Sequence, residues 1–167
     1  MAITVHLVRR QNTMSRVMAL LLIFIVALTA AACGSGSTSP STVTAVDGPL
    51  VVKDAWVRAA AAGADTAVYF TIVNGTAAPD MLLSAATDAA QAAGIHETTT
   101  DASGMTGMHM LPSLEIPGGG TVQFAPGGYH VMLTSLKRAI SAGDTVTVTL
   151  TFQNAGVVTV NAQARAN

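Results

Sequence analysis

From residue 50 onward, the chain is divided into short segments in which apolar and polar residues alternate. The clearest segment is residues 145–152 (TVTVTLTF), where four threonines alternate with four apolar residues. A period of two is typical of a β-strand that buries one face. The same pattern predicts eight further strands, at residues 50–57, 66–73, 81–86, 92–98, 105–111, 121–124, 129–135 and 157–161.

Glycine, proline and asparagine mark the turns between these segments, as at Asn74-Gly75 and in the runs 117–120 and 126–128. The alanine-rich stretch 82–93 favours a helix by composition. It lacks an apolar stripe, however, so we expect a strand, a turn and a strand there. Nine short strands predict an all-β fold, a two-sheet Greek-key β-sandwich. Trp56, the only tryptophan, is expected to pack in the core between the sheets.

The N-terminal region has the three parts of an export signal. Residues 1–16 contain three arginines, residues 17–28 form an unbroken apolar run, and three alanines at 30–32 precede Cys33. The apolar run is too short for a membrane span, which favours a signal peptide over residues 1–32. The alternative is an uncleaved helix followed by a buried cysteine. A start at Met14 would also leave the signal complete.

The cysteine that directly follows the small residues resembles that of a bacterial lipobox, although Ala30 stands where leucine is usual. The resemblance implies that Cys33 carries lipid and becomes the N-terminus of the exported protein. Residues 34–42 are rich in Gly, Ser and Thr, as in a flexible tether. We therefore expect a lipid-anchored protein at the outer face of the cell membrane or in the periplasm, with a tether over 33–48 and a β-sandwich domain over 49–163.

Composition and charge exclude several classes of function. Half of the residues are apolar and only 10% are charged, which excludes a disordered chain. The eight Lys and Arg residues are nowhere clustered, which argues against nucleic-acid binding. A single cysteine excludes any site that needs several thiolates. No Ser/His/Asp arrangement or carboxylate pair stands out, so we expect no enzyme.

Imidazole and thioether groups gather in one part of the chain. Of the eight His and Met residues beyond Cys33, seven lie between residues 96 and 132, namely His96, Met105, Met108, His109, Met110, His130 and Met132. This soft donor set favours Cu(I) over zinc, calcium or magnesium. On a strand, residues two apart share a face, so His130 and Met132 can reach one ion, and so can Met108 and Met110. Methionine also fills cores, but core residues would be spread over all strands.

The spacing of these residues resembles that of periplasmic copper chaperones of the PCuAC type. In that family a His is followed after ten residues by a Met, and after twenty-one more by His-X-Met. Here eleven residues separate His96 from Met108, and twenty-one separate Met108 from His130. The resemblance extends to the segments DAWVRA, TAVYF, IHET, IPGGG and PGGYHVML, at 54–59, 66–70, 95–98, 116–120 and 126–133. Met110 matches the family's methionine by local context and is the alternative to Met108, and Met105 could act as an extra methionine.

The resemblance implies a cupredoxin-like β-sandwich that binds one Cu(I) through His96, Met108, His130 and Met132. It also implies delivery to an acceptor, such as the copper centre of cytochrome c oxidase or another copper chaperone. A blue-copper electron carrier is excluded, because its thiolate ligand is lacking. Two alternatives stay open, a copper storage or resistance lipoprotein and a lipid-anchored β-sandwich that binds no metal.

Overall fold

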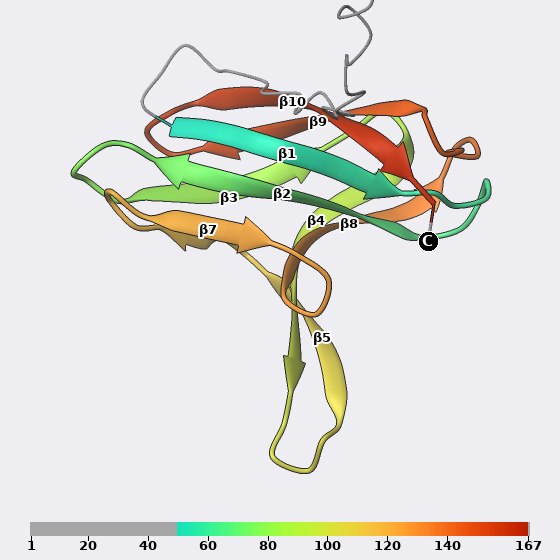
Figure 1. Cartoon of the computed structure of the whole chain (residues 1–167), viewed down its shortest axis with the longest axis horizontal. Coiled ribbons are helices and arrows are strands. Elements are labelled where there is room, and N and C mark those ends of the chain that lie inside the picture. Colours follow the sequence, from blue (N-terminus) through green and yellow to red (C-terminus); the bar gives the residue numbers. More distant parts are fainter. Residues whose placement is uncertain (1–49, 167) are drawn as a thin grey trace, which may run out of the picture. The chain divides into compact units, whose positions relative to one another are not determined.

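Ten β-strands make up the computed structural model, which describes residues 50–166, and no helix occurs among these residues (Figure 1). The strands are β1 (Leu50–Arg58), β2 (Thr66–Asn74), β3 (Asp80–Ala86), β4 (Ala90–Thr100), β5 (Thr106–Leu111), β6 (Leu114–Ile116), β7 (Thr121–Phe124), β8 (Tyr129–Leu136), β9 (Thr145–Phe152) and β10 (Val157–Arg165). The expectation of an all-β fold is confirmed. All nine predicted strands are present, and the alanine-rich stretch is a strand, a turn and a strand.

The ten strands are hydrogen-bonded into one mixed sheet in the order β5-β4-β8-β7-β2-β1-β10-β9-β3-β6, with a further pairing of β8 with β2. Most neighbours are antiparallel, whereas β1 pairs with β10, and β7 with β8, in parallel. The strands curve around a shared core, as Figure 1 shows. This order brings β4, β5, β8 and β2 together on one side of the molecule, where the His and Met residues lie.

Alternating apolar residues supply the core as predicted. Along β9, Val146, Val148, Leu150 and Phe152 are all buried, and the threonines between them are exposed or half-buried. Phe70 and Phe124 stack with their ring centroids 4.3 Å apart. Burial of aliphatic and aromatic side chains of this kind is the main term that stabilises such a fold.

The prediction that Trp56 packs in the core is wrong. Between Lys53 and Trp56 strand β1 has one more residue than β2 opposite, and Asp54 in this bulge has φ 58°. An extra residue reverses which face the following side chains occupy. Buried positions therefore pass from Leu50 and Val52 to Ala55 and Val57, and Trp56 stays half-buried on the outer face.

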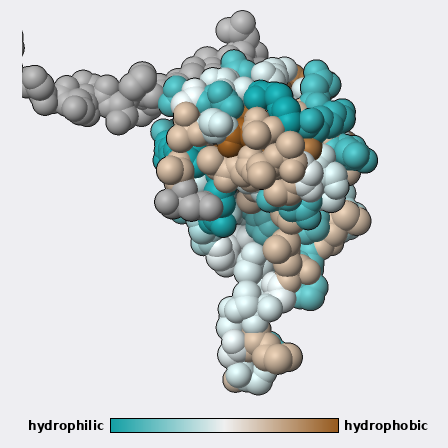
Figure 2. All heavy atoms as spheres, turned by 90° about the vertical axis from the view of Figure 1, so that its right-hand side faces the viewer, coloured by the Kyte–Doolittle hydropathy of each residue, from teal (hydrophilic) through white to brown (hydrophobic). Residues whose placement is uncertain are grey.

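Strands β4 and β5 form a hairpin that extends away from the other strands (Figure 1). Only the first part of β4 pairs with β8, up to Glu97, whereas β5 pairs with β4 from Ile95 to Thr100. The carboxylate of Asp101 holds the turn by accepting hydrogen bonds from the backbone N–H groups of Ser103 and Met105. The space-filling view shows apolar colour at the end of this hairpin (Figure 2).

Several expectations concern residues 1–49, which lie outside the described residues. They are the signal peptide over 1–32, the lipidation of Cys33 and the tether over 33–48. Within the part of the chain that the structure describes, no helix has the length and apolar character needed to cross a membrane.

Candidate metal centre

The strand register brings the predicted donor residues to one face of the sheet. His96 on β4 lies opposite Met110 on one side and His130 on the other. Two residues after His96 on β4, Thr98 lies opposite Met108 on β5. Two residues before His96, Gly94 lies opposite Met132 on β8. Because directly opposite residues point the same way, His96, Met108, Met110, His130 and Met132 share this face.

The opposite face of the same strands carries none of these five residues. Ile95 and Val131 pair with each other and are buried in the core. Glu97 and His109 pair on that side as well. In this register Glu97 and His109 point away from His96, Met108, Met110, His130 and Met132.

His130 is the best-oriented donor of the cluster. The residue is 4% exposed, and its Nδ1 lies 3.0 Å from the carbonyl oxygen of Gly128. A carbonyl oxygen only accepts hydrogen bonds, so Nδ1 carries the proton and donates it. In the neutral ring Nε2 then has a free lone pair, and it points at the sulfur of Met108 at 3.3 Å. The carbonyl of Gly128 thereby fixes the tautomer in which Nε2 binds metals.

Two lone-pair donors that face each other form an arrangement that suits a soft cation. A nitrogen and a sulfur atom that share one first-row metal ion lie roughly 3–4 Å apart. The 3.3 Å between His130 Nε2 and Met108 Sδ falls in this range. The pair is therefore close to the geometry in which both atoms bind the same ion.

His96 lies beside His130, with the two ring centroids 5.8 Å apart. Its Nδ1 is buried and lacks a hydrogen-bond partner among the residues that the structure describes. Burial lowers the pKa of His96, and the neighbouring His130 lowers it further. Both effects keep the imidazole neutral, which is the form that binds a metal.

Gly94 leaves room for the side chains on either side of it. A Cβ atom at this position would lie 3.3 Å from Nε2 of His96 and 3.8 Å from Sδ of Met110. Both donor atoms therefore lie close above the backbone of Gly94. Sequence reasoning did not single out Gly94, although its place two residues before His96 on a strand puts it on the same face.

A cavity of about 320 Å³ opens beside His130. Its walls come from β1, β2, β4, β5, β8 and the loops before β2 and β8, through Arg58, Asp65, Thr66, Ala67, Tyr69, Thr98, Met108, Pro126, Gly127, His130 and Met132. Met132 thus lines the same cavity as Met108 and His130. Met105 is not among these residues and lies in the hairpin turn, where it is 70% exposed.

An aromatic row covers one side of His130. The ring centroid of Tyr69, a buried residue, lies 6.3 Å from that of His130 and 4.5 Å from that of Trp56. The guanidinium of Arg165 lies over Trp56 at 5.2 Å from the ring centroid. The bulge in β1 positions Trp56 for this role, because it turns the indole to the outer face. The row limits the access of water to His130 from this side.

Exposure divides the methionines of the cluster. Met110 is 72% exposed and Met108 is 52% exposed, whereas Met132 is half-buried. The exposed thioethers stand on the hairpin, and Met132 stands within the sheet. An ion at this site would be within reach of a partner protein.

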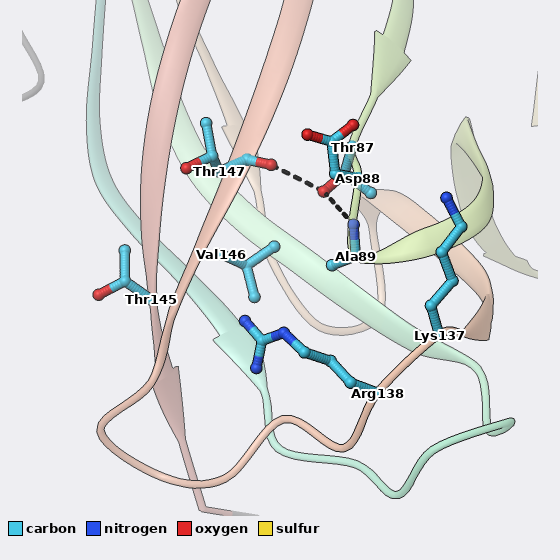
Figure 3. A pocket seen from close by; sticks show the side chains of 8 residues that line it. All are labelled: Thr87, Asp88, Ala89, Lys137, Arg138, Thr145, Val146 and Thr147. Atoms are coloured by element: carbon cyan, nitrogen blue, oxygen red, sulfur yellow. Dashed lines mark hydrogen bonds between the residues drawn. The ribbon is translucent and has the colours of Figure 1, made fainter.

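A second hollow lies elsewhere and carries a different chemistry (Figure 3). It is lined by Thr87, Asp88, Ala89, Lys137, Arg138, Thr145, Val146 and Thr147, and none of these is a histidine or methionine. The hydroxyl of Thr87 donates to the carbonyl oxygen of Thr147 and accepts from the N–H of Ala89. Among the described residues, no group of three His, Cys, Asp or Glu side chains could hold a metal ion. The His/Met cluster is therefore the candidate site.

Comparison with known sequences links residues 50–164 to a family described as "Putative lipoprotein LpqE-like". A curated relative is the putative lipoprotein Lxx21020 of Leifsonia xyli subsp. xyli (strain CTCB07), 37% identical over 108 residues. The match covers 65% of this chain and 64% of that relative's length.

Comparison with solved structures finds domains named for copper. The copper-bound PCuAC domain from PmoF2 is 25% identical, with a TM-score of 0.62, and the match covers 74% of this chain and 97% of that one. The solution structure of CuI-DR1885 from Deinococcus radiodurans is 39% identical, with a TM-score of 0.55, and the match covers 68% and 76%. The expected cupredoxin-like fold of the PCuAC type is thereby confirmed.

Proposed function

Because the chain belongs to the LpqE-like lipoprotein family, we propose that it is an exported, lipid-anchored protein that binds Cu(I) and passes it to an acceptor. The proposed ligands are His96, Met108, His130 and Met132, with Met110 as the alternative to Met108. The solved structure of CuI-DR1885 supports the choice of ion, since its name includes Cu(I) and its sequence is 39% identical.

One observation carries the proposal. His130 Nε2 has its lone pair directed at the sulfur of Met108 at 3.3 Å, while Nδ1 is held by the carbonyl of Gly128. Imidazole and thioether without thiolate or carboxylate favour a soft monovalent ion such as Cu(I). A site of neutral ligands also holds Cu(I) without a net negative charge that would attract harder divalent ions.

The position of the site at the surface favours transfer of the ion to an acceptor protein. The thioethers on the hairpin are more than half exposed, so ligands of an acceptor can approach the ion and replace them one at a time. We propose that the acceptor is another protein that receives copper. It could be the subunit of cytochrome c oxidase that holds a copper centre, or a second copper chaperone. The protein has a binding and transfer role in this scheme and performs no catalysis.

The test is an anaerobic titration of Cu(I) against a chromophoric Cu(I) chelator, with the full chain in detergent micelles. Every sample carries Cys33→Ser, so that a thiol does not compete for the ion. We expect the protein to withdraw one equivalent, and the double variant His130→Ala/Met132→Ala to withdraw little. His109→Ala is the matched control, because its ring lies on the opposite face of the hairpin.

Two outcomes would contradict the proposal. A folded protein that withdraws no Cu(I) would leave an anchored β-sandwich with another ligand. Equal loss of binding in His109→Ala and in the double variant would place the ion elsewhere.

A second comparison separates delivery from storage or resistance. Storage or resistance predicts expression that rises with excess copper, whereas delivery predicts a growth requirement for the gene when copper is limiting.

A further inference from the structure

We propose that an acidic surface of the copper acceptor docks on the outer face of β1 and β10, beside the donor cluster. The contact residues are Trp56, Arg58 and Arg165, which together are called the arginine face. The inference rests on the proposed function and deepens it, because it states what kind of protein surface approaches the ion. It also assigns a role to residues that bind no copper themselves.

The strand register places the arginine face and the donor cluster on the same side of the sheet. Strands β1 and β10 run side by side (Figure 1), and Arg58 lies opposite Arg165. On the other side of β1, Trp56 lies opposite Tyr69, whose ring lies beside that of His130. Arg58 also lines the cavity that His130 lines. A partner that covers the donor residues can therefore reach both arginines.

Two like charges meet on the arginine face. Arg58 and Arg165 occupy directly opposite positions on paired strands, and like charges in such positions repel each other and destabilise a sheet. Neither guanidinium forms an ion pair with a side chain in the described part of the chain. The fold thus keeps a repulsive pair of charges that an anionic partner can neutralise.

The two carboxylates nearest to this face do not neutralise it. Asp65 lines the same cavity as Arg58, but its Oδ1 accepts the backbone N–H of Ser135 at 2.8 Å. Asp54 lines a hollow that Arg165 also lines, and the two form no ion pair. Guanidinium groups bind carboxylates through paired N–H donors. Both arginines can therefore receive carboxylates from a partner.

The distribution of charge sets this face apart from the rest of the domain. The described residues include eight acidic and five basic side chains, so negative charge is in excess. Three of the five basic residues, Lys53, Arg58 and Arg165, nevertheless lie on β1 and β10. A positive face on a domain with excess negative charge turns that face toward an acidic partner during approach.

Trp56 supplies an apolar anchor and orders one of the two charges. The guanidinium of Arg165 lies over the indole at 5.2 Å from the ring centroid, a position in which the ring attracts the cation. Trp56 is half-buried and packs on Tyr69 with the ring centroids 4.5 Å apart. Tryptophan and arginine are the residue types that most often dominate the binding energy of protein interfaces.

Bound copper adds to the attraction. Imidazole and thioether ligands are neutral, so Cu(I) raises the charge of the donor cluster by one unit. An acidic surface therefore binds the loaded protein more tightly than the empty one. After transfer this extra attraction is lost, which favours departure of the partner with the ion.

The experiment measures how fast Cu(I) passes from the loaded full chain to two synthetic acceptor peptides. Both peptides contain the same Cys-X-X-Cys segment to bind Cu(I), and it is flanked by glutamates in one and by glutamines in the other. The full chain carries Cys33→Ser in micelles of a non-ionic detergent, without oxygen. Stopped-flow absorption of the copper–thiolate complex follows the transfer.

For the wild type at low salt, we expect the Glu peptide to receive Cu(I) about 10-fold faster than the Gln peptide. This rate ratio should fall to about 2 or less in roughly 1 M salt, where the Debye length is about 3 Å. Arg58→Gln/Arg165→Gln should lower the ratio to about 2 already at low salt. Arg58→Lys/Arg165→Lys should keep most of it, because the charges remain. Any change in the donor site itself affects both peptides and cancels in the ratio.

The matched control is Lys137→Gln/Arg138→Gln. It removes the same number of positive side chains from the second hollow, whose walls contain no histidine or methionine (Figure 3). This variant should keep the ratio of the wild type.

Equal rates for the two peptides with the wild type would overturn the proposal. The same loss of the ratio in both glutamine double variants would also overturn it, since the net charge of the protein would then be responsible. An unchanged ratio in Arg58→Gln/Arg165→Gln, together with weaker binding to phosphatidylglycerol vesicles, would assign the face to lipid headgroups instead. Failure of the proposed function looks different, because the wild type would then take up no Cu(I) to transfer.

Discussion

At the scale of single residues, Asp80 links three parts of the chain at the end of the sandwich away from the donor cluster. Its side chain is 5% exposed, and its carboxylate accepts hydrogen bonds from the backbone N–H groups of Met81, Asn154 and Ala155. Burial by itself raises the pKa of Asp80, but these backbone donors outweigh it and lower the pKa overall. The charged carboxylate therefore stabilises the folded state.

We predict that Asp80→Ala lowers the free energy of unfolding by about 2–4 kcal/mol at neutral pH, because buried N–H groups lose their acceptor. The effect depends on pH. The folded state lowers the pKa of Asp80, so its contribution is complete above the ordinary carboxyl pKa of about 4 and is lost as the pH falls further. Urea unfolding at several pH values measures this difference.

The control for this prediction is Asp88→Ala, which removes an exposed carboxylate from the turn before β4. It should change stability by less than about 0.5 kcal/mol. A difference between wild type and Asp80→Ala that stays constant down to low pH would contradict the role assigned to the charge.

At the scale of elements, the bulge in β1 decides what surrounds the site. Asp54 has φ 58°, a backbone conformation that Gly adopts freely, that Asp and Asn tolerate, and that β-branched residues avoid. The extra residue turns Trp56 outward, where it packs on Tyr69, which in turn packs against His130. One unusual backbone angle thus supports the aromatic row.

We predict that Asp54→Val destabilises the fold by about 1–2 kcal/mol, the cost of a left-handed conformation for a branched residue. Asp54→Gly should be neutral or slightly stabilising at the same position. Chemical unfolding followed by Trp56 fluorescence compares the two variants. Equal stability of both variants would mean that the backbone angle is not what limits substitution at this position.

At the scale of the whole molecule, the donor cluster exists only when distant strands meet. His96 and Met132 are separated by more than thirty residues in the chain but lie on adjacent, paired strands. The unfolded chain does not hold the donors together, so an ion that binds the cluster binds the folded state. Copper binding and folding are therefore linked.

We predict that Cu(I), supplied anaerobically at a free concentration of about 100 times its dissociation constant, raises the free energy of unfolding by about 2.7 kcal/mol. In His130→Ala this gain should largely disappear, and in His109→Ala it should persist. Urea unfolding with and without the buffered ion gives the values. The same gain in His130→Ala as in the wild type would show that the stabilising ion binds outside the cluster.

Local sequence patterns were enough to predict the strands and the chemistry of the donor groups. Alternation with a period of two is a local property, and turn residues interrupt it locally, so all nine strands and the stretch 82–93 could be predicted. The three-residue strand β6 was not predicted from the sequence, because it is too short to show a period of two. The cluster of His and Met residues and their shared faces were also visible, since residues two apart on a strand point the same way.

How these groups meet depends on contacts between segments that are distant in the chain. Trp56 is outside the core because a single extra residue at Asp54 reverses the alternation, and no local hydrophobic pattern marks that residue. The contact of Met108 with His130, the place of Met110 beside His96 and the position of both donor atoms above Gly94 all depend on the register between strands. Register is set by the packing of the whole sheet, and the residues that it joins are distant in the chain, so their spacing alone leaves the pairing of donors open.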